Sequence, residues 1–300
     1  MTFFTRFMLL AAAVMAISLP VFAQTDEEVI SVDSSIVVLN ATILDSEGKP
    51  VAGLKQNQFK IFENGTEQPI TFFAAEETPF AAVLLLDTSG SMEERVSLAR
   101  SATIRFLDGI RTDDTTAIFR FDSKVSLIQG FSNSRDIVED VFDIKSKGMT
   151  ALNDAIFQAA QELEKRPEKR RAIIVLSDGM DTFSGKSSDK ALKAALSADA
   201  VIYTVDMSSV DTSGRQRAQN QGVLKNFAEK TGGMFISTPG GAAMRDAFKN
   251  IVEELGVQYT LGYQPLDAKK DGKWRPITLT VSRPNLTIRT RKGYNAEKTR

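Results

Sequence analysis

The stretch Ala81–Ser91, which reads AAVLLLDTSGS, decides the fold class of this 300-residue chain. Its first six residues are apolar without interruption, as is typical of a strand buried on both faces of a parallel sheet. The turn residues Asp87-Thr88-Ser89-Gly90 end that strand, and apolar side chains then recur at helical spacing from 92 to 110. A buried strand followed directly by an amphipathic helix predicts the first unit of an α/β fold.

The same alternation of strands and helices continues to about residue 256. It predicts a doubly wound, mostly parallel sheet with helices on both faces, a Rossmann-like arrangement, and we assign residues 80–256 to this domain. The expected strands are 81–86, 116–121, 125–128, 172–176, 201–205 and 234–237. The expected helices are 92–110, 134–144, 151–165, 187–198, 215–230 and 241–255.

The flanking segments, 24–79 and 257–300, have strand character instead. Asn64-Gly65 separates two strand patterns and is a strong hairpin signal, because both residues tolerate the positive φ of a type I′ turn. The expected strands are 35–44, 59–63, 66–73, 257–264, 277–282 and 287–291. Since neither flank has enough strands to bury a core alone, we expect the two to pair into a small β-sandwich.

Residues 1–23 have the pattern of a signal peptide. Arg6 precedes an apolar stretch, and Val21-Phe22-Ala23 supplies small residues at the cleavage positions before Gln24. The apolar run covers Phe7–Leu19, which at about 13 residues is short for a membrane span of about 20. We therefore expect an exported protein, periplasmic or secreted, with no membrane span after signal cleavage.

The composition excludes much of enzyme chemistry. The chain has no Cys and no His, so it can form no disulfide, no thiolate nucleophile, no Ser-His-Asp triad and no zinc site built on those residues. Any metal must be held by oxygen, which favours hard cations. The 37 basic and 38 acidic residues are nearly balanced, and the basic C-terminal tail has few interleaved aromatics, so we expect no nucleic-acid partner.

Oxygen-bearing side chains follow the strands at the positions where a parallel sheet binds ligands. In such sheets the carboxyl ends of the strands share one edge, so turn residues after different strands are expected to converge. Two carboxylates and three hydroxyls suit Mg²⁺, with Mn²⁺ or Ca²⁺ as alternatives. Taken singly, Ser91 and Thr150 also read as helix caps and Asp178 as an ordinary turn residue. The candidate ligands are Asp87, Ser89, Ser91, Thr150 and Asp178.

With these residues in view, the stretch from about 80 to 255 resembles a von Willebrand factor type A domain. Asp87-Thr88-Ser89-Gly90-Ser91 matches the DxSxS loop of that family, Thr150 its metal-loop threonine and Asp178 its later strand-end aspartate. The resemblance implies a metal ion-dependent adhesion site. Ser89 and Ser91 would bind the ion directly, Thr150 in the ligand-competent state, and the two aspartates largely through water. A partner's Asp or Glu would fill the open coordination position.

The flanks resemble the exported bacterial branch of proteins related to this domain. Its V-x-G-L and F-x-I-F-E-N-G runs match Val51–Leu54 and Phe59–Gly65. Its Y-x-L-G-Y and R-K-G-Y runs match Tyr259–Tyr263 and Arg291–Tyr294. One departure is Met149, where many relatives have Gly; it is expected to stiffen the threonine loop or to change its contact surface.

These observations predict a non-enzymatic, exported adhesion module that binds a partner carboxylate through Mg²⁺. Two alternatives stay open: a metal-dependent hydrolase with Asp87 as nucleophile or base, and a scaffold whose strand-end residues bind nothing. Further acidic residues near strand ends are candidates for a supporting role around the ion, although turn and helix-start positions favour acids anyway. They are Asp122, Asp154, Asp181 and Asp206.

Overall fold

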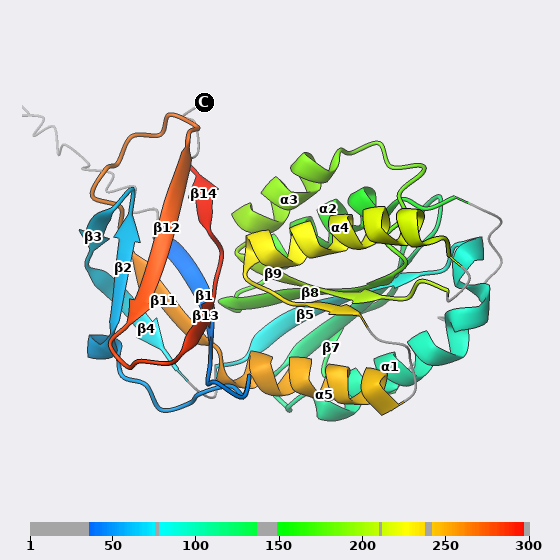
Figure 1. Ribbon diagram of the computed structural model, residues 1–300, viewed down its shortest axis with the longest axis horizontal. Coiled ribbons are helices and arrows are strands. Elements are labelled where there is room, and N and C mark those ends of the chain that lie inside the picture. Colours follow the sequence, from blue (N-terminus) through cyan, green and yellow to red (C-terminus); the bar gives the residue numbers. More distant parts are fainter. Residues whose placement is uncertain (1–35, 76–77, 137–148, 210–211, 238–241, 297–300) are drawn as a thin grey trace, which may run out of the picture. The chain divides into compact units, whose positions relative to one another are not determined.

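The computed structural model describes residues 36–75, 78–136, 149–209, 212–237 and 242–296 (Figure 1). The predicted signal peptide and most of the helix expected at 134–144 lie outside the described residues. Residues 35–300 form one compact unit. Within this unit an α/β domain and a β-sandwich each have a hydrophobic core. The structure confirms the predicted fold class, whereas the domain boundaries stay predictions.

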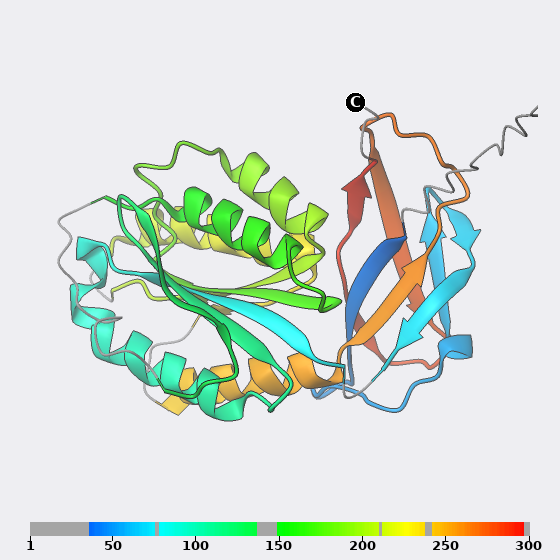
Figure 2. The same ribbon diagram turned by 180° about the vertical axis from the view of Figure 1, so that it is seen from behind.

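A six-stranded sheet in the order β10-β9-β8-β5-β6-β7 is the centre of the α/β domain. Its neighbouring strands are parallel except at one edge, where β7 runs antiparallel to β6 (Figure 2). The central position of β5 explains its unbroken apolar run, because every residue of that strand is buried. The strands are β5 (Phe80–Asp87), β6 (Thr115–Phe121), β7 (Val125–Ser132), β8 (Arg170–Ser177), β9 (Ala200–Asp206) and β10 (Phe235–Ser237).

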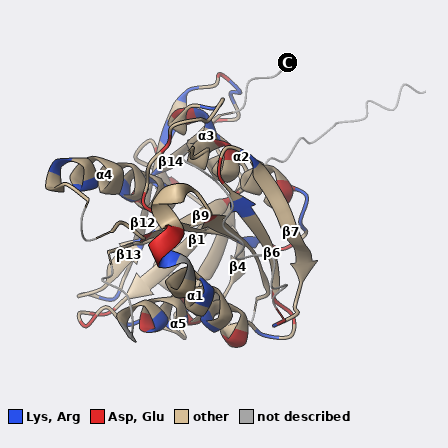
Figure 3. Ribbon diagram, turned by 90° about the vertical axis from the view of Figure 1, so that its right-hand side faces the viewer, with Lys and Arg blue, Asp and Glu red and all other residues tan. Residues whose placement is uncertain are grey.

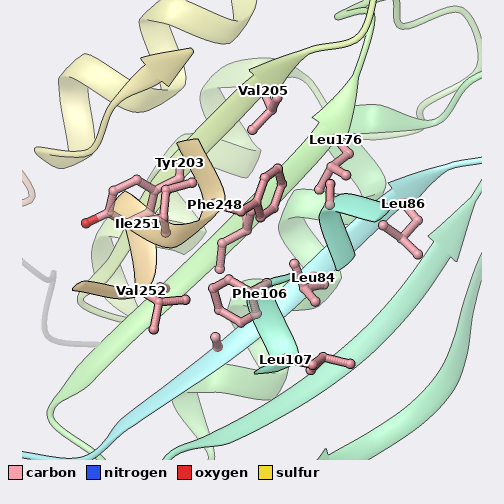
Figure 4. Close-up of a cluster of buried hydrophobic side chains, with 14 of the residues drawn as sticks. Leu84, Leu86, Phe106, Leu107, Leu176, Tyr203, Val205, Phe248, Ile251 and Val252 are labelled. Atoms are coloured by element: carbon pink, nitrogen blue, oxygen red, sulfur yellow. The ribbon is translucent and has the colours of Figure 1, made fainter. Parts of the chain in front are cut away.

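Helices cover both faces of this sheet, α1 and α5 on one and α2, α3 and α4 on the other (Figure 1). Leu84 and Leu86 lie in one hydrophobic cluster with Phe106 and Phe248 of the first pair, and Figure 4 shows Leu84 beside Phe106. The intervening Leu85 packs on the opposite side. The helices are α1 (Val96–Gly109), α2 (Leu152–Glu164), α3 (Ser188–Ser197), α4 (Gly214–Thr231) and α5 (Ala242–Val257).

Two readings of the helix starts need correction. The helix expected from residue 92 begins as a 3-10 turn, η2 (Gly90–Arg95), so Ser91 lies inside that turn and does not cap α1. The N-cap position of α2 is Ala151, and its side chain makes no capping hydrogen bond, so Thr150 is not the cap either. Both hydroxyls therefore lack the structural role that the sequence offered for them.

The flanking strands form a β-sandwich of two four-stranded antiparallel sheets, β13-β1-β11-β4 and β14-β12-β2-β3. As expected, strands from the two ends of the chain pair, β1 with β11 and β2 with β12. The strands are β1 (Val37–Leu44), β2 (Phe59–Glu63), β3 (Thr66–Gln68), β4 (Ile70–Ala74), β11 (Tyr259–Tyr263), β12 (Trp274–Val281), β13 (Thr287–Arg289) and β14 (Gly293–Asn295). A short 3-10 turn, η1 (Gln56–Gln58), precedes β2.

One predicted strand of the sandwich is wrong in a specific way. Residues 66–73 form two strands that belong to different sheets, β3 and β4, with Pro69 between them. Proline has no N–H to give to a ladder, which ends the pairing of β3 with β2 and lets the chain cross to the other sheet. The Asn64-Gly65 turn itself is confirmed, with φ of 50° and 81°.

The flanking motif residues are joined by hydrogen bonds inside the sandwich. The Tyr259 hydroxyl donates to the Val51 carbonyl and accepts from the Leu54 N–H, both at 2.9 Å. The hydroxyls of Tyr263 and Tyr294 both donate to the buried Glu63 carboxylate, at 2.7 and 2.9 Å. These hydrogen bonds give the residues of the flanking motifs a structural role within the sandwich.

Candidate metal centre

The five predicted ligands all lie at the carboxyl-end edge of the parallel sheet. Asp87 is the last residue of β5, and Asp178 directly follows β8, its hydrogen-bonded neighbour. Ser89 directly precedes η2, Ser91 lies within it, and Thr150 lies just before α2. Sequence positions up to 91 residues apart are thus brought to one edge by the register of two parallel strands.

Asp87 is held by groups from both strands. Its Oδ1 accepts a hydrogen bond from the Ser89 N–H at 2.9 Å, and its Oδ2 accepts one from the Ser177 hydroxyl at 2.6 Å. The Oγ atoms of Ser89 and Ser91 lie 3.1 Å apart. The DxSxS turn therefore places one carboxylate and two hydroxyls together, as the sequence predicted.

The electrostatic setting of Asp87 is unusual for a carboxylate. Its side chain is almost inaccessible, with 3% of the residue exposed. Burial raises the pKa of Asp87 to about 7, the hydrogen bonds from Ser177 and Ser89 oppose that rise, and the nearby Asp178 adds to it. In the part of the chain that the structure describes, no Lys or Arg forms an ion pair with this carboxylate. Burial therefore favours the protonated form of Asp87, and a bound cation would favour the carboxylate instead.

Asp178 is fixed by a turn that only glycine can make. Its Oδ1 accepts a hydrogen bond from the Met180 N–H at 2.9 Å, and the residue is 6% exposed. Gly179 between them has φ +82°, and a Cβ there would lie 2.6 Å from the carbonyl oxygen of Asn220. The turn after β8 can therefore approach α4 closely only with glycine at this position.

Thr150 is held in place through its backbone. Its carbonyl accepts hydrogen bonds from the N–H groups of Thr182 and Phe183, at 2.9 and 3.0 Å, and its N–H donates to the Thr182 hydroxyl at 3.0 Å. The residue is 2% exposed. The loop after β8 thus anchors the threonine loop, and the backbone contacts leave the Thr150 side chain uninvolved.

The other acidic residues near this edge have structural partners. Asp181 accepts hydrogen bonds from the N–H groups of Asn153 and Ser184, and Asp154 accepts from those of Gly185 and Lys186. Asp122 accepts from the N–H of Lys124, and Asp206 from the N–H of Ser208 and the amide of Gln221. These contacts favour turn and capping roles over a supporting role around an ion.

Ser177 is the site residue that the sequence reasoning missed. It is the last residue of β8, and its hydroxyl both donates to Asp87 and accepts the Gly179 N–H at 3.0 Å. The only signal for it was a hydroxyl directly before Asp178 at the end of an apolar strand. A serine at the end of a strand is common in proteins. Its contact with Asp87 arises only because β5 lies beside β8.

The donor set fits a hard divalent cation. All candidate ligands offer oxygen, and within the described ranges the buried Asp87 carboxylate has no ion pair with a Lys or Arg. Among the described residues no group of three or more Asp or Glu side chains is placed to hold a metal ion. The hydroxyls of Ser89, Ser91 and Thr150 would therefore have to contribute alongside the two carboxylates.

Comparisons with known proteins show what the α/β domain resembles. Residues 82–180 match the family model of the von Willebrand factor type A domain. This part of the chain is similar to a von Willebrand factor type A domain. The matched range includes all five candidate ligands, so the type A domain and the oxygen-lined edge are the same part of the molecule.

Individual relatives agree with this assignment. Inter-alpha-trypsin inhibitor heavy chain H3 of Bos taurus is 27% identical over 140 residues, which are 41% of this chain and 16% of the bovine protein. A von Willebrand factor type A structure from Catenulispora acidiphila has a TM-score of 0.50 and 13% identity, covering 88% of this chain and 64% of that one. The pilus adhesin SpaC of Lactobacillus rhamnosus GG has a TM-score of 0.50 and 10% identity, covering 82% and 49%. These two structures show similarity of fold.

Proposed function

We propose that this chain is an exported, non-enzymatic binding module that holds Mg²⁺ at the Asp87 edge and uses it to bind an Asp or Glu carboxylate of a partner protein. The single observation that carries the proposal is the buried Asp87 carboxylate beside the paired Ser89 and Ser91 hydroxyls, with Asp178 and Thr150 in the loops at the same edge of the sheet. Mn²⁺ and Ca²⁺ are the alternative ions, since both accept oxygen ligands.

The roles of the residues follow from their contacts. Ser89 and Ser91 would offer their adjacent hydroxyls to the ion, and Thr150 would offer a third. Asp87 and Asp178 would supply negative charge, largely through water, while Ser177 keeps the Asp87 carboxylate oriented. A bound divalent ion provides a positive centre that attracts an incoming carboxylate.

An adhesive role on the outside of the cell is part of the proposal. The expected signal peptide supports export, and SpaC, which has a similar fold, is a pilus adhesin. In the described ranges, no helix combines the length and the apolar character needed to cross a membrane. Whether the bovine heavy chain and this protein share a partner class is a separate matter, because their similarity covers 16% of the bovine chain.

Thermal unfolding with and without Mg²⁺ tests the metal site. We expect Mg²⁺ to raise the melting temperature of the wild type over that in EDTA, because a ligand that binds only the folded state stabilises it. D87N should lose this rise. D122N is the matched control, since Asp122 lies at a neighbouring strand end but has its own turn contacts. A rise that D87N retains in full would contradict the assignment.

The rival proposal, a metal-dependent hydrolase, has one observation in its favour. A carboxylate whose pKa lies at about 7 is suited to general-base chemistry near neutral pH. Against it, both oxygens of Asp87 already accept hydrogen bonds and the residue is 3% exposed, which leaves little access for a substrate. Mg²⁺-dependent turnover of a phosphate-ester or peptide-ester panel, abolished by D87N, would favour this rival.

A further inference from the structure

Two large apolar side chains are exposed beside the candidate metal site. Met149 is 47% exposed and Phe183 is 53% exposed. Scattered apolar residues are normal on protein surfaces, but these two belong to different loops whose backbones are hydrogen-bonded to each other. Met149 directly precedes Thr150, and the Phe183 N–H donates to the Thr150 carbonyl at 3.0 Å.

The backbone beneath these side chains is fixed. Thr150 and Thr182 exchange two hydrogen bonds, one from the Thr182 N–H to the Thr150 carbonyl and one from the Thr150 N–H to the Thr182 hydroxyl. The next residues are held too, since the Ser184 N–H donates to Asp181. Exposed apolar groups on a firmly held backbone lose little conformational entropy on binding, which makes them good anchors for a partner.

The charges around the edge are asymmetric. On one side, η2 carries the exposed acidic residues Glu93 and Glu94, whose acidic ribbon lies at the start of α1 in Figure 3. Three residues after Phe183 in the chain, the ammonium group of Lys186 lies 5.1 Å from the centre of the Phe157 ring. An acidic partner segment would be repelled near η2 and attracted toward Lys186, so it would extend across the loops that carry Met149 and Phe183.

We propose that Met149 and Phe183 form an apolar contact surface, and that the partner segment carries an Asp or Glu next to a large apolar side chain. This inference rests on the proposed function, because the carboxylate would bind the ion and the apolar neighbour would cover these two residues. About half of each side chain is already buried, so the two present a shallow surface suited to a protein segment. Met149 and Phe183 would thus contribute to the choice of partner.

Phage-displayed random peptides, selected on the full chain in Mg²⁺ and in EDTA, test this inference. In Mg²⁺ we expect enrichment of sequences with Asp or Glu beside Leu, Phe or Met, and no such enrichment in EDTA. A synthetic peptide with the enriched sequence should bind M149S and F183S about tenfold more weakly than the wild type, because truncating a central apolar anchor has effects of this size. L266S is the control, since Leu266 is 64% exposed on the sandwich.

The result separates this inference from the proposed function. M149S and F183S should keep the Mg²⁺-dependent rise in melting temperature, because neither side chain is a candidate ligand. If the rise is present but the enriched peptides lack an apolar neighbour, or no peptides are enriched, the contact surface is wrong while the metal site stands. Equal binding of the enriched peptide to F183S and wild type would also overturn it. Absence of the rise in the wild type would overturn both.

Discussion

Asp87 links folding to protonation in a way that can be measured without a metal ion. Burial raises its pKa from the ordinary 3.8 to about 7, so the folded state retains a proton that the unfolded chain has released. The free energy of unfolding therefore falls as the pH rises through this window, and the loss is complete only above about pH 7. Below about pH 4 both states are protonated and no loss remains.

This linkage predicts how D87N differs from the wild type in EDTA. Asn cannot ionise, so the free energy of unfolding of the variant should not fall with rising pH through this group. Between pH 4 and pH 8 we expect the free energy of unfolding of D87N to rise relative to that of the wild type by roughly 4 kcal/mol, since one pKa unit corresponds to about 1.4 kcal/mol. Urea unfolding at both pH values measures it. The same pH dependence in both proteins would show that Asp87 is not the responsible group.

At the residue scale the sequence predicted which residues end the strands, and the metal-binding role of those residues stays a prediction. The turn residues Asp87, Ser89 and Asp178 follow apolar strands, and strand ends can be read from composition alone. Ser177 could not be identified, because its contact with Asp87 depends on which strands are neighbours. The order of strands along the chain does not reveal which strands are neighbours in a doubly wound sheet. A residue such as Ser177, whose role depends on a contact with the neighbouring strand, therefore cannot be recognised from the sequence pattern.

At the scale of elements, the start of α2 shows what the sequence could not supply. Ala151 occupies the N-cap position without a capping side chain, and Asp181 from the loop after β8 bonds the Asn153 N–H instead, at 3.2 Å. Helical periodicity predicted the helix within one residue at each end, but its cap comes from 28 residues away. A cap supplied from another loop has no local sequence signal.

We therefore expect D181A to destabilise the α/β domain. Loss of an N-terminal capping carboxylate typically costs about 1 kcal/mol, and the bond from the Ser184 N–H would be lost as well. Because Asp181 also holds the loop beside Thr150, the Mg²⁺-dependent rise in melting temperature should become smaller without disappearing. Chemical unfolding and the Mg²⁺ titration measure the two effects. D189A, which removes an acid from the first turn of α3, is the control, and an equal loss there would point to a general dipole effect.

At the scale of the whole chain segment from 35 to 300, the sandwich and the α/β domain are joined by polar contacts. The pairing of the N- and C-terminal strands followed from the small number of strands in each flank. The sequence did not predict that buried polar side chains would face the α/β domain. Asn40 donates to the carbonyls of Lys169 and Asp199, and Glu254 accepts from Thr42 and Tyr203. In a strand where polar and apolar residues alternate, the polar residues are predicted to face solvent. The pattern does not reveal that another part of the chain covers them.

Arg170 is the centre of this junction, and its removal is the most severe change we predict. The residue is fully buried at the start of β8. Its guanidinium donates to the Ala75 and Thr78 carbonyls in the connection before β5, to the Gly256 carbonyl at the end of α5 and to the Thr260 hydroxyl in β11. Burial and the nearby Arg111 lower its pKa to about 10, which leaves it charged at neutral pH. One side chain thus joins four segments.

R170M should lower the free energy of unfolding by at least about 3 kcal/mol, because several buried acceptors would lose their donor at once and each costs about 1–3 kcal/mol. Since these acceptors belong to segments that join the sandwich to the α/β domain, the single unfolding transition expected of the wild type should split in two. R245M, an exposed arginine on α5, is the control and should change stability by no more than about 0.5 kcal/mol. Calorimetry distinguishes the outcomes: one sharp transition in R170M, shifted no further than in R245M, would mean that the junction does not depend on Arg170.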